Sequence, residues 1–86
     1  SAEANLSYEQ RKRLKSEAGK AQTRVKRLEQ EIADHEARIQ ELDALFGDGG
    51  QLQSLSADEL RTKTEERAQL QKQLEERLAE WESLAS

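Results

Sequence analysis

Basic side chains near the start of the chain are the residues whose type and spacing best suit a chemical role. The first 27 positions hold eight Lys or Arg and three acidic residues, a net charge of +5, whereas the rest holds six basic and fifteen acidic residues. Clustered cations bind phosphate through charge alone, without reading base sequence. The alternative is a solubilising surface that pairs with acidic groups. The candidate nucleic-acid-binding residues are Arg11, Lys12, Arg13, Lys15, Lys20, Arg24, Lys26 and Arg27.

Three of these residues have the spacing of neighbours on one helical face. Lys20, Arg24 and Arg27 follow one another at intervals of four and three residues. Lys12 or Lys15 extends roughly the same face toward the start of the chain. This pattern predicts a basic stripe that contacts phosphate.

No other group of residues predicts a reaction or a bound ion. His35 is the single histidine and cysteine is absent, so we expect neither a metal site nor a disulfide. The numerous carboxylates are expected on a solvated surface, because a narrow helical unit offers no cavity that excludes water. We therefore expect no enzymatic activity within this chain and no cofactor.

The basic residues lie in a segment whose heptad repeat predicts a helix, and this helix must position them. From Leu14 to Phe46 the core positions alternate at intervals of four and three residues, the 3.5-residue period of a coiled coil. The helix is predicted over residues 7–46, begun by a capping box of Ser7 and Gln10. Gly19 is its weakest position, which suggests a bend or break near residues 16–20. The predicted core positions are Leu14, Ala18, Ala21, Val25, Leu28, Ile32, His35, Ile39, Leu42 and Phe46.

A second helix is predicted over residues 56–85, after a loop over residues 47–55 in which Gly47 suits the left-handed position that ends a helix. Ser56 and Glu59 form the expected capping box of this helix. Residues 1–5 are expected to be a disordered tail. The predicted core positions of the second helix are Leu60, Thr64, Arg67, Gln71, Leu74, Leu78, Trp81 and Ala85.

Two helices joined by so short a loop are expected to pack antiparallel. The fold class predicted is therefore all-α, a two-helix antiparallel coiled-coil hairpin, and we expect a monomer. The favoured register sets Val25 against Trp81 and His35 against Gln71, and a shift of one heptad is the alternative. In the favoured register residues 7–20 extend past the end of the second helix.

Composition agrees with a small helical unit. Charged residues make up 37% of the 86 positions, aromatic residues 3%, and proline is absent. The chain is too short for a deep core, so burial must follow one thin seam. No apolar run approaches the roughly 20 residues of a membrane span, and no signal peptide is visible.

Several motifs resemble the C-terminal coiled-coil domain of ABC-F ATP-binding proteins of the Uup-like group. The resemblance covers residues 6–84, and the Leu-Ser-Tyr start and Trp-Glu end are its most specific parts. The matching segments are Leu6-Ser7-Tyr8, the basic run 11–15, residues 27–32, the turn, residues 56–60 and residues 80–84.

The resemblance implies a cytoplasmic protein whose two ATPase domains lie outside this chain and are its partners. It also implies that this domain is non-catalytic and binds DNA or ribosomal RNA through basic side chains. The alternative function is a structural or protein-docking coiled coil without a role in nucleic-acid binding. These two functions predict different surroundings for the basic side chains. A basic face left exposed favours the first, and basic residues paired with carboxylates of the second helix favour the other.

Overall fold

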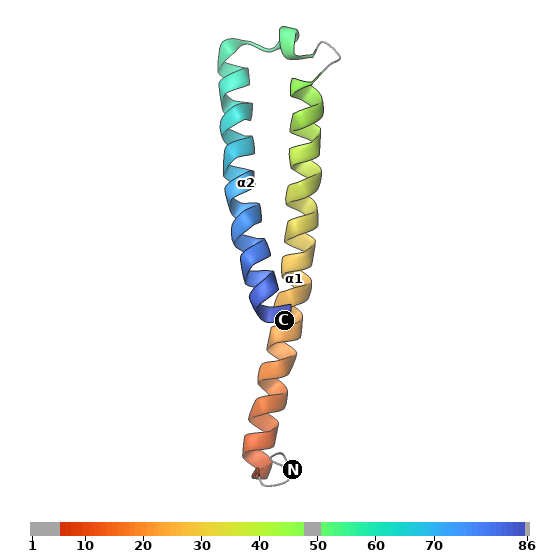
Figure 1. Ribbon diagram of the computed structural model, residues 1–86, viewed down its shortest axis with the longest axis vertical. Helices are drawn as coiled ribbons and strands as arrows, with labels where there is room; N and C mark the ends of the chain where they lie inside the picture. Colours follow the sequence, from red (N-terminus) through yellow and green to blue (C-terminus); the bar gives the residue numbers. More distant parts are fainter. Residues whose placement is uncertain (1–5, 48–50, 86) are drawn as a thin grey trace.

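The chain folds as a long helical hairpin in the computed structural model, which describes residues 6–47 and 51–85. Helix α1 (Tyr8–Phe46) is followed by a short 3-10 helix, η2 (Leu52–Ser54), and by helix α2 (Ala57–Ala85). The rod measures 67 × 20 × 14 Å, and α2 returns along α1 but stops well short of its N-terminal end (Figure 1). The predicted all-α antiparallel hairpin is confirmed. The tail predicted over residues 1–5 lies outside the described residues.

Helix α1 begins at the predicted capping box and runs without interruption. The Ser7 hydroxyl accepts a hydrogen bond from the Gln10 N–H, and the Gln10 side chain accepts one from the Ser7 N–H. The helix continues through Gly19, so no break occurs at this residue. Good helix formers on both sides offset the cost of one glycine. The Thr23 hydroxyl donates to the Gly19 carbonyl at 3.0 Å.

The end of α1 differs from the prediction. Gly47 has φ −83° and ψ −165°, an extended conformation rather than the left-handed one expected from its position. Its N–H still donates to the Asp43 carbonyl at 2.9 Å, which closes the last turn without requiring a positive φ. The 3-10 turn that follows was not predicted. It is closed by hydrogen bonds from the Ser54 N–H and hydroxyl to the Gln51 carbonyl.

Helix α2 begins where the sequence places it. The Ser56 hydroxyl accepts a hydrogen bond from the Glu59 N–H at 3.1 Å. Asp58 and Glu59 occupy its first turn, where carboxylates stabilise the positive end of the helix dipole.

The core is a single seam between the helices. Leu28, Ile32, Ile39 and Leu42 of α1 and Leu74 of α2 are buried. Leu70 and Trp81 of α2 pack against the cluster that four of these residues form, Leu28, Ile32, Ile39 and Leu74. The predicted heptad of α1 is thus the buried stripe wherever α2 lies alongside it.

The buried stripe of α2 is rotated relative to the prediction. Leu78, expected in the seam, is 41% exposed, and Leu60 is 38% exposed. Leu70 is partly buried against the core instead, and Arg77 takes the place expected for Leu78 by pairing with Glu31 across the seam. A long arginine stem covers apolar surface while its guanidinium stays at the edge, so arginine can occupy this position.

Ion pairs across the helix interface establish the register. Arg24, the chain neighbour of Val25, pairs with Glu80, the chain neighbour of Trp81, which agrees with the favoured register. The alternative shift of one heptad would have placed Glu80 near Gly19. Further pairs across the interface are Arg38–Glu66, Arg67–Asp43 and Arg77–Glu31.

His35 lies in the seam, but its partner is not the predicted one. Its Nδ1 lies 2.7 Å from the Glu31 carbonyl oxygen, and its Nε2 lies 3.0 Å from Oε1 of Gln73. Gln71 instead donates to Glu75 on its own helix. The rotation of α2 explains the change, because it turns residue 73 toward α1 and residue 71 toward the edge.

Candidate nucleic-acid interface

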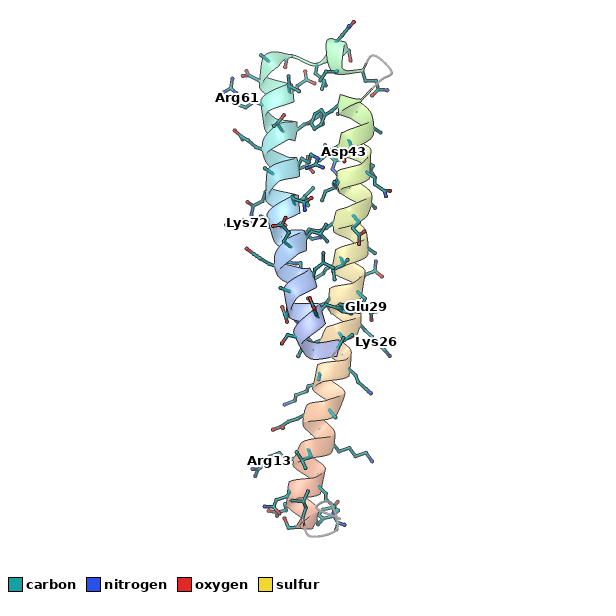
Figure 2. All side chains as sticks on the ribbon, viewed as in Figure 1. Arg13, Lys26, Glu29, Asp43, Arg61 and Lys72 are labelled. Carbon is teal, nitrogen blue, oxygen red and sulfur yellow. The ribbon has the colours of Figure 1, made fainter. Side chains whose placement is uncertain are left out.

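The N-terminal part of α1 extends beyond the end of α2. We call residues 8–20 the overhang; every one of them is exposed. Figure 2 shows Arg13 on this segment, well away from the last turn of α2. The overhang exists because α1 has 39 residues and α2 has 29, and the loop joins them at the opposite end. It carries five basic and two acidic residues.

Arg24 does not belong to an open basic stripe. Its guanidinium makes two hydrogen bonds to the Glu80 carboxylate, at 2.6 and 2.8 Å. This pairing holds the pKa of Glu80 below its usual value. The stripe predicted from Lys20, Arg24 and Arg27 is therefore interrupted, because its central residue joins the two helices.

A different set of basic residues shares an open face. Arg13, Lys20 and Arg27 are separated by seven residues each and are all exposed. Seven residues make two turns of a coiled-coil helix, so these side chains lie in one line with steps of roughly 10 Å. Lys12 and Lys26 form a second line, fourteen residues apart.

These two lines flank Ser16 and Thr23 on the side of α1 opposite its seam. We call the surface of Lys12, Arg13, Lys20, Lys26 and Arg27 the outer basic face. Part of it is visible as a shallow hollow bordered by Lys12, Arg13, Ser16 and Lys20, together with Glu9 and Glu17. The two carboxylates reduce the positive charge at one end of this face.

The other two candidates lie elsewhere. Arg11 and Lys15 are exposed and four residues apart, on the seam side of the overhang next to Leu14. The structure therefore divides the eight predicted residues into five on the outer basic face, two beside the overhang seam, and Arg24 in an ion pair. The heptad numbering of the sequence already contained the line of Arg13, Lys20 and Arg27. The partner of Arg24 depended on the register.

Other charged residues at the helix interface also neutralise one another. Arg38 makes two hydrogen bonds to Glu66, at 2.7 and 3.0 Å, and Arg67 makes two to Asp43. These guanidiniums lower the pKa of Glu66 and of Asp43, chiefly through the hydrogen bonds themselves. The charges at the helix interface therefore stabilise the hairpin and are not available to a phosphate ligand.

Among residues 6–47 and 51–85, no three His, Asp or Glu side chains lie close enough together to hold a metal ion. Nor does any helix in those two ranges carry an apolar stretch long enough to cross a membrane. Comparison with family models, with curated proteins and with solved structures found no match.

Proposed function

We propose that this chain is a non-catalytic accessory domain of an ABC-F-type ATPase that binds DNA or ribosomal RNA without sequence specificity. The contact surface is the outer basic face, and the ATPase domains of the parent chain are its other partners. The family assignment is supported by the sequence motifs, and the nucleic-acid role by the motifs and the placement of charge.

One observation carries the nucleic-acid role: the five cations of the outer basic face remain exposed although the protein is net acidic. Arg24, Arg38, Arg67 and Arg77 all pair with carboxylates across the helix interface. The outer basic face lies on the side of α1 away from α2, where the carboxylates of that helix do not cover it. A positive surface of this kind attracts phosphate through charge.

The dimensions of this face suit a nucleic-acid backbone. From Arg13 to Arg27 it extends for roughly 21 Å of helix, which corresponds to about six base pairs of duplex at 3.4 Å each. If all five cations neutralise a phosphate, the slope of log K against log salt is about −4.5. Residues 28–86 hold fifteen acidic and six basic residues, so the rest of the hairpin repels phosphate and binding is confined to the end of the rod with the overhang.

The test is binding of a labelled duplex DNA, and separately of isolated ribosomes, across a range of salt concentration. The double variant Arg13→Gln/Lys20→Gln removes two cations of the face. It should flatten the salt slope by about 1.8 and weaken binding at low salt. Helicity should be unchanged, because both residues are exposed and glutamine is a good helix former.

The matched control is Arg61→Gln/Lys72→Gln, which removes the same charge from exposed positions of α2 (Figure 2). It should leave the slope close to that of the parent. If the two double variants weaken nucleic-acid binding equally, then binding depends on the net charge of the protein and not on the outer basic face. Parent-like binding of DNA and ribosomes by the Arg13/Lys20 variant would refute the proposal.

A further inference from the structure

Serine and threonine hydroxyls of the hairpin fall into two groups. Five in the described residues make a hydrogen bond that caps a helix, closes a turn or reaches the carbonyl one helical turn earlier: Ser7, Thr23, Ser54, Ser56 and Thr64. Three others within the described ranges are exposed and make no hydrogen bond: Ser16, Thr62 and Ser83. The first group supports the fold, whereas the second is open to modification.

Ser16 differs from the other two in its charged surroundings. Lys12, Arg13 and Lys20 lie one helical turn from it and border the same shallow hollow. Two carboxylates also border this hollow, but neither is three or four residues from Ser16, so neither is its neighbour on the helix surface. A negative group attached to the Ser16 hydroxyl therefore has three cations as its nearest charged neighbours along the helix.

Thr62 and Ser83 have the opposite surroundings. Glu80 lies one turn before Ser83. An added negative charge is repelled at both positions, because like charges one turn apart destabilise a helix. The residues three and four positions from Thr62, on both sides, are all carboxylates: Asp58, Glu59, Glu65 and Glu66.

The sequence before Ser16 suits an enzyme that recognises basic side chains. Positions 11–15 hold four cations and no carboxylate, with Arg13 three residues and Arg11 five residues before Ser16. Protein kinases select substrates by the pattern of charge around the acceptor, and a substrate cleft lined by carboxylates accepts a segment of this kind. The acidic segment before Thr62 would be rejected by the same cleft.

The helix around Ser16 is also the part of α1 that opens most easily. Residues 8–20 are all exposed, and α2 does not pack against them. A helix of this length without a partner is marginally stable in water. Gly19 weakens it further, and packing does not require a glycine there, since an added Cβ meets no atom within 4 Å. The segment can therefore open locally to enter an enzyme cleft.

We propose that Ser16 is a phosphorylation site for a Ser/Thr protein kinase that recognises arginine, and that its phosphate blocks the outer basic face. ATP is the phosphoryl donor. A bond forms between Oγ of Ser16 and the γ-phosphorus as the bond from that phosphorus to the bridging oxygen breaks and ADP leaves. The hydroxyl proton passes to the catalytic aspartate of the kinase.

The phosphate acts on the outer basic face through charge. Phosphoserine carries about −1.5 to −2 at pH 7 and accepts charge-assisted hydrogen bonds, for which Lys12, Arg13 and Lys20 are the available donors. It therefore cancels about two of the five positive charges of the face. The effect on nucleic-acid binding rests on the function proposed above, but the modification itself does not.

The first experiment tests the site. The protein is incubated with ATP and a recombinant Ser/Thr kinase that selects arginine three and five residues before its acceptor, and the phosphate is located by mass spectrometry. Ser16 should be modified, whereas Thr62 and Ser83 should not. Arg11→Gln/Arg13→Gln should lower the initial rate at least about tenfold, because it removes two charge-assisted contacts.

The matched control is Lys26→Gln/Arg27→Gln, which removes equal charge from exposed positions farther along α1 and should change the rate by less than about twofold. Gly19→Ala should slow the reaction by up to about fivefold, since it stabilises the helix that has to open. Absence of phosphate on Ser16 would overturn the inference, as would equal modification of Thr62.

The second experiment tests the effect on binding of a labelled duplex DNA across salt concentration. Phosphorylation of Ser16 should flatten the slope of log K against log salt by about 1.8 and weaken binding at low salt. Ser16→Glu adds one charge and should flatten it by about 0.9, whereas Ser16→Gln should bind as the parent does. Thr62→Glu adds the same charge at the far end of the rod and should leave the slope close to that of the parent.

The two experiments separate the two proposals. If the unmodified protein binds neither DNA nor ribosomes, the proposed function fails, and modification of Ser16 is still decided by the kinase reaction. If the unmodified protein binds DNA and the Ser16-phosphorylated protein binds it with the same salt slope, the regulatory inference is overturned while the proposed function stands. A similar loss of binding in Thr62→Glu and Ser16→Glu would overturn it too.

Discussion

Two leucines of the same heptad series allow a sharp test of where the hairpin ends. Leu28 and Leu14 are both core positions by spacing, fourteen residues apart on one helix. The structure buries Leu28 completely and leaves Leu14 53% exposed. Their replacement by alanine should therefore have very different consequences, although the sequence pattern treats them alike.

The expected effect of Leu28→Ala follows from its burial. Removing a buried leucine side chain loses its transfer free energy and leaves a cavity, and costs 2–5 kcal/mol in proteins, so we expect about 3 kcal/mol. A domain of this length has a total stability of about 4–13 kcal/mol. The loss should lower Tm by roughly 12–24 °C. Leu14→Ala should change the free energy of unfolding by less than about 0.5 kcal/mol.

The assay is thermal and urea unfolding followed by circular dichroism, at two protein concentrations. Leu14→Ala should have the same Tm as the parent protein at both protein concentrations. Leu28→Ala should have a much lower Tm. Comparable destabilisation by the two substitutions would mean that the overhang seam is covered in solution. A loss below about 1 kcal/mol for Leu28→Ala would show that the interface is not packed as described.

Three further predictions concern other parts of the hairpin. Gly19→Ala should raise amide protection in the overhang, measured by hydrogen exchange, by up to about 1 kcal/mol, because alanine has the higher helix propensity. The added Cβ meets no atom within 4 Å, so it causes no clash. Unchanged exchange rates would contradict this prediction. Trp81 packs against the core, but its buried Nε1 has no hydrogen-bond partner. Trp81→Phe should therefore cost much less than the roughly 3 kcal/mol or more expected for Trp81→Ala, and equal losses in urea unfolding would refute that account. Folding lowers the pKa of Asp43, Glu66 and Glu80, so the folded chain binds fewer protons than the unfolded one. The stability that the ion pairs of these three carboxylates contribute should be complete above about pH 5 and should decrease as pH falls through the lowered pKa values. A Tm that stays constant on acidification to about pH 3 would contradict the pairing.

Much of the local structure follows directly from the sequence. The heptad of α1 predicts its buried residues because the 3.5-residue period leaves one stripe facing a partner helix. The hydroxyls of Ser7 and Ser56 mark the helix starts, since a capping side chain binds N–H groups only a few residues away. Such interactions are local, so no knowledge of the partner helix is needed to recognise them.

The stripe that α2 buries required the tertiary structure. Two neighbouring stripes of α2 have comparable apolar content, one through Gln71 and Leu78 and one through Leu70 and Arg77. Spacing alone favours the first, whereas in the structure Leu70 packs against the core and Arg77 reaches Glu31 across the seam. The same rotation replaced Gln71 by Gln73 as the partner of His35.

For the candidate nucleic-acid interface, too, part was predictable from the sequence and part depended on the tertiary structure. The sequence by itself determined that the first third of the chain is basic, that its helix carries a heptad, and that this helix is longer than the second. The tertiary structure alone decided which cations remain exposed, because α2 supplies Glu80 to Arg24 and ends before it reaches the overhang. Charge and helical period are properties of one chain segment. The pairing of a side chain depends on what the other helix places opposite it.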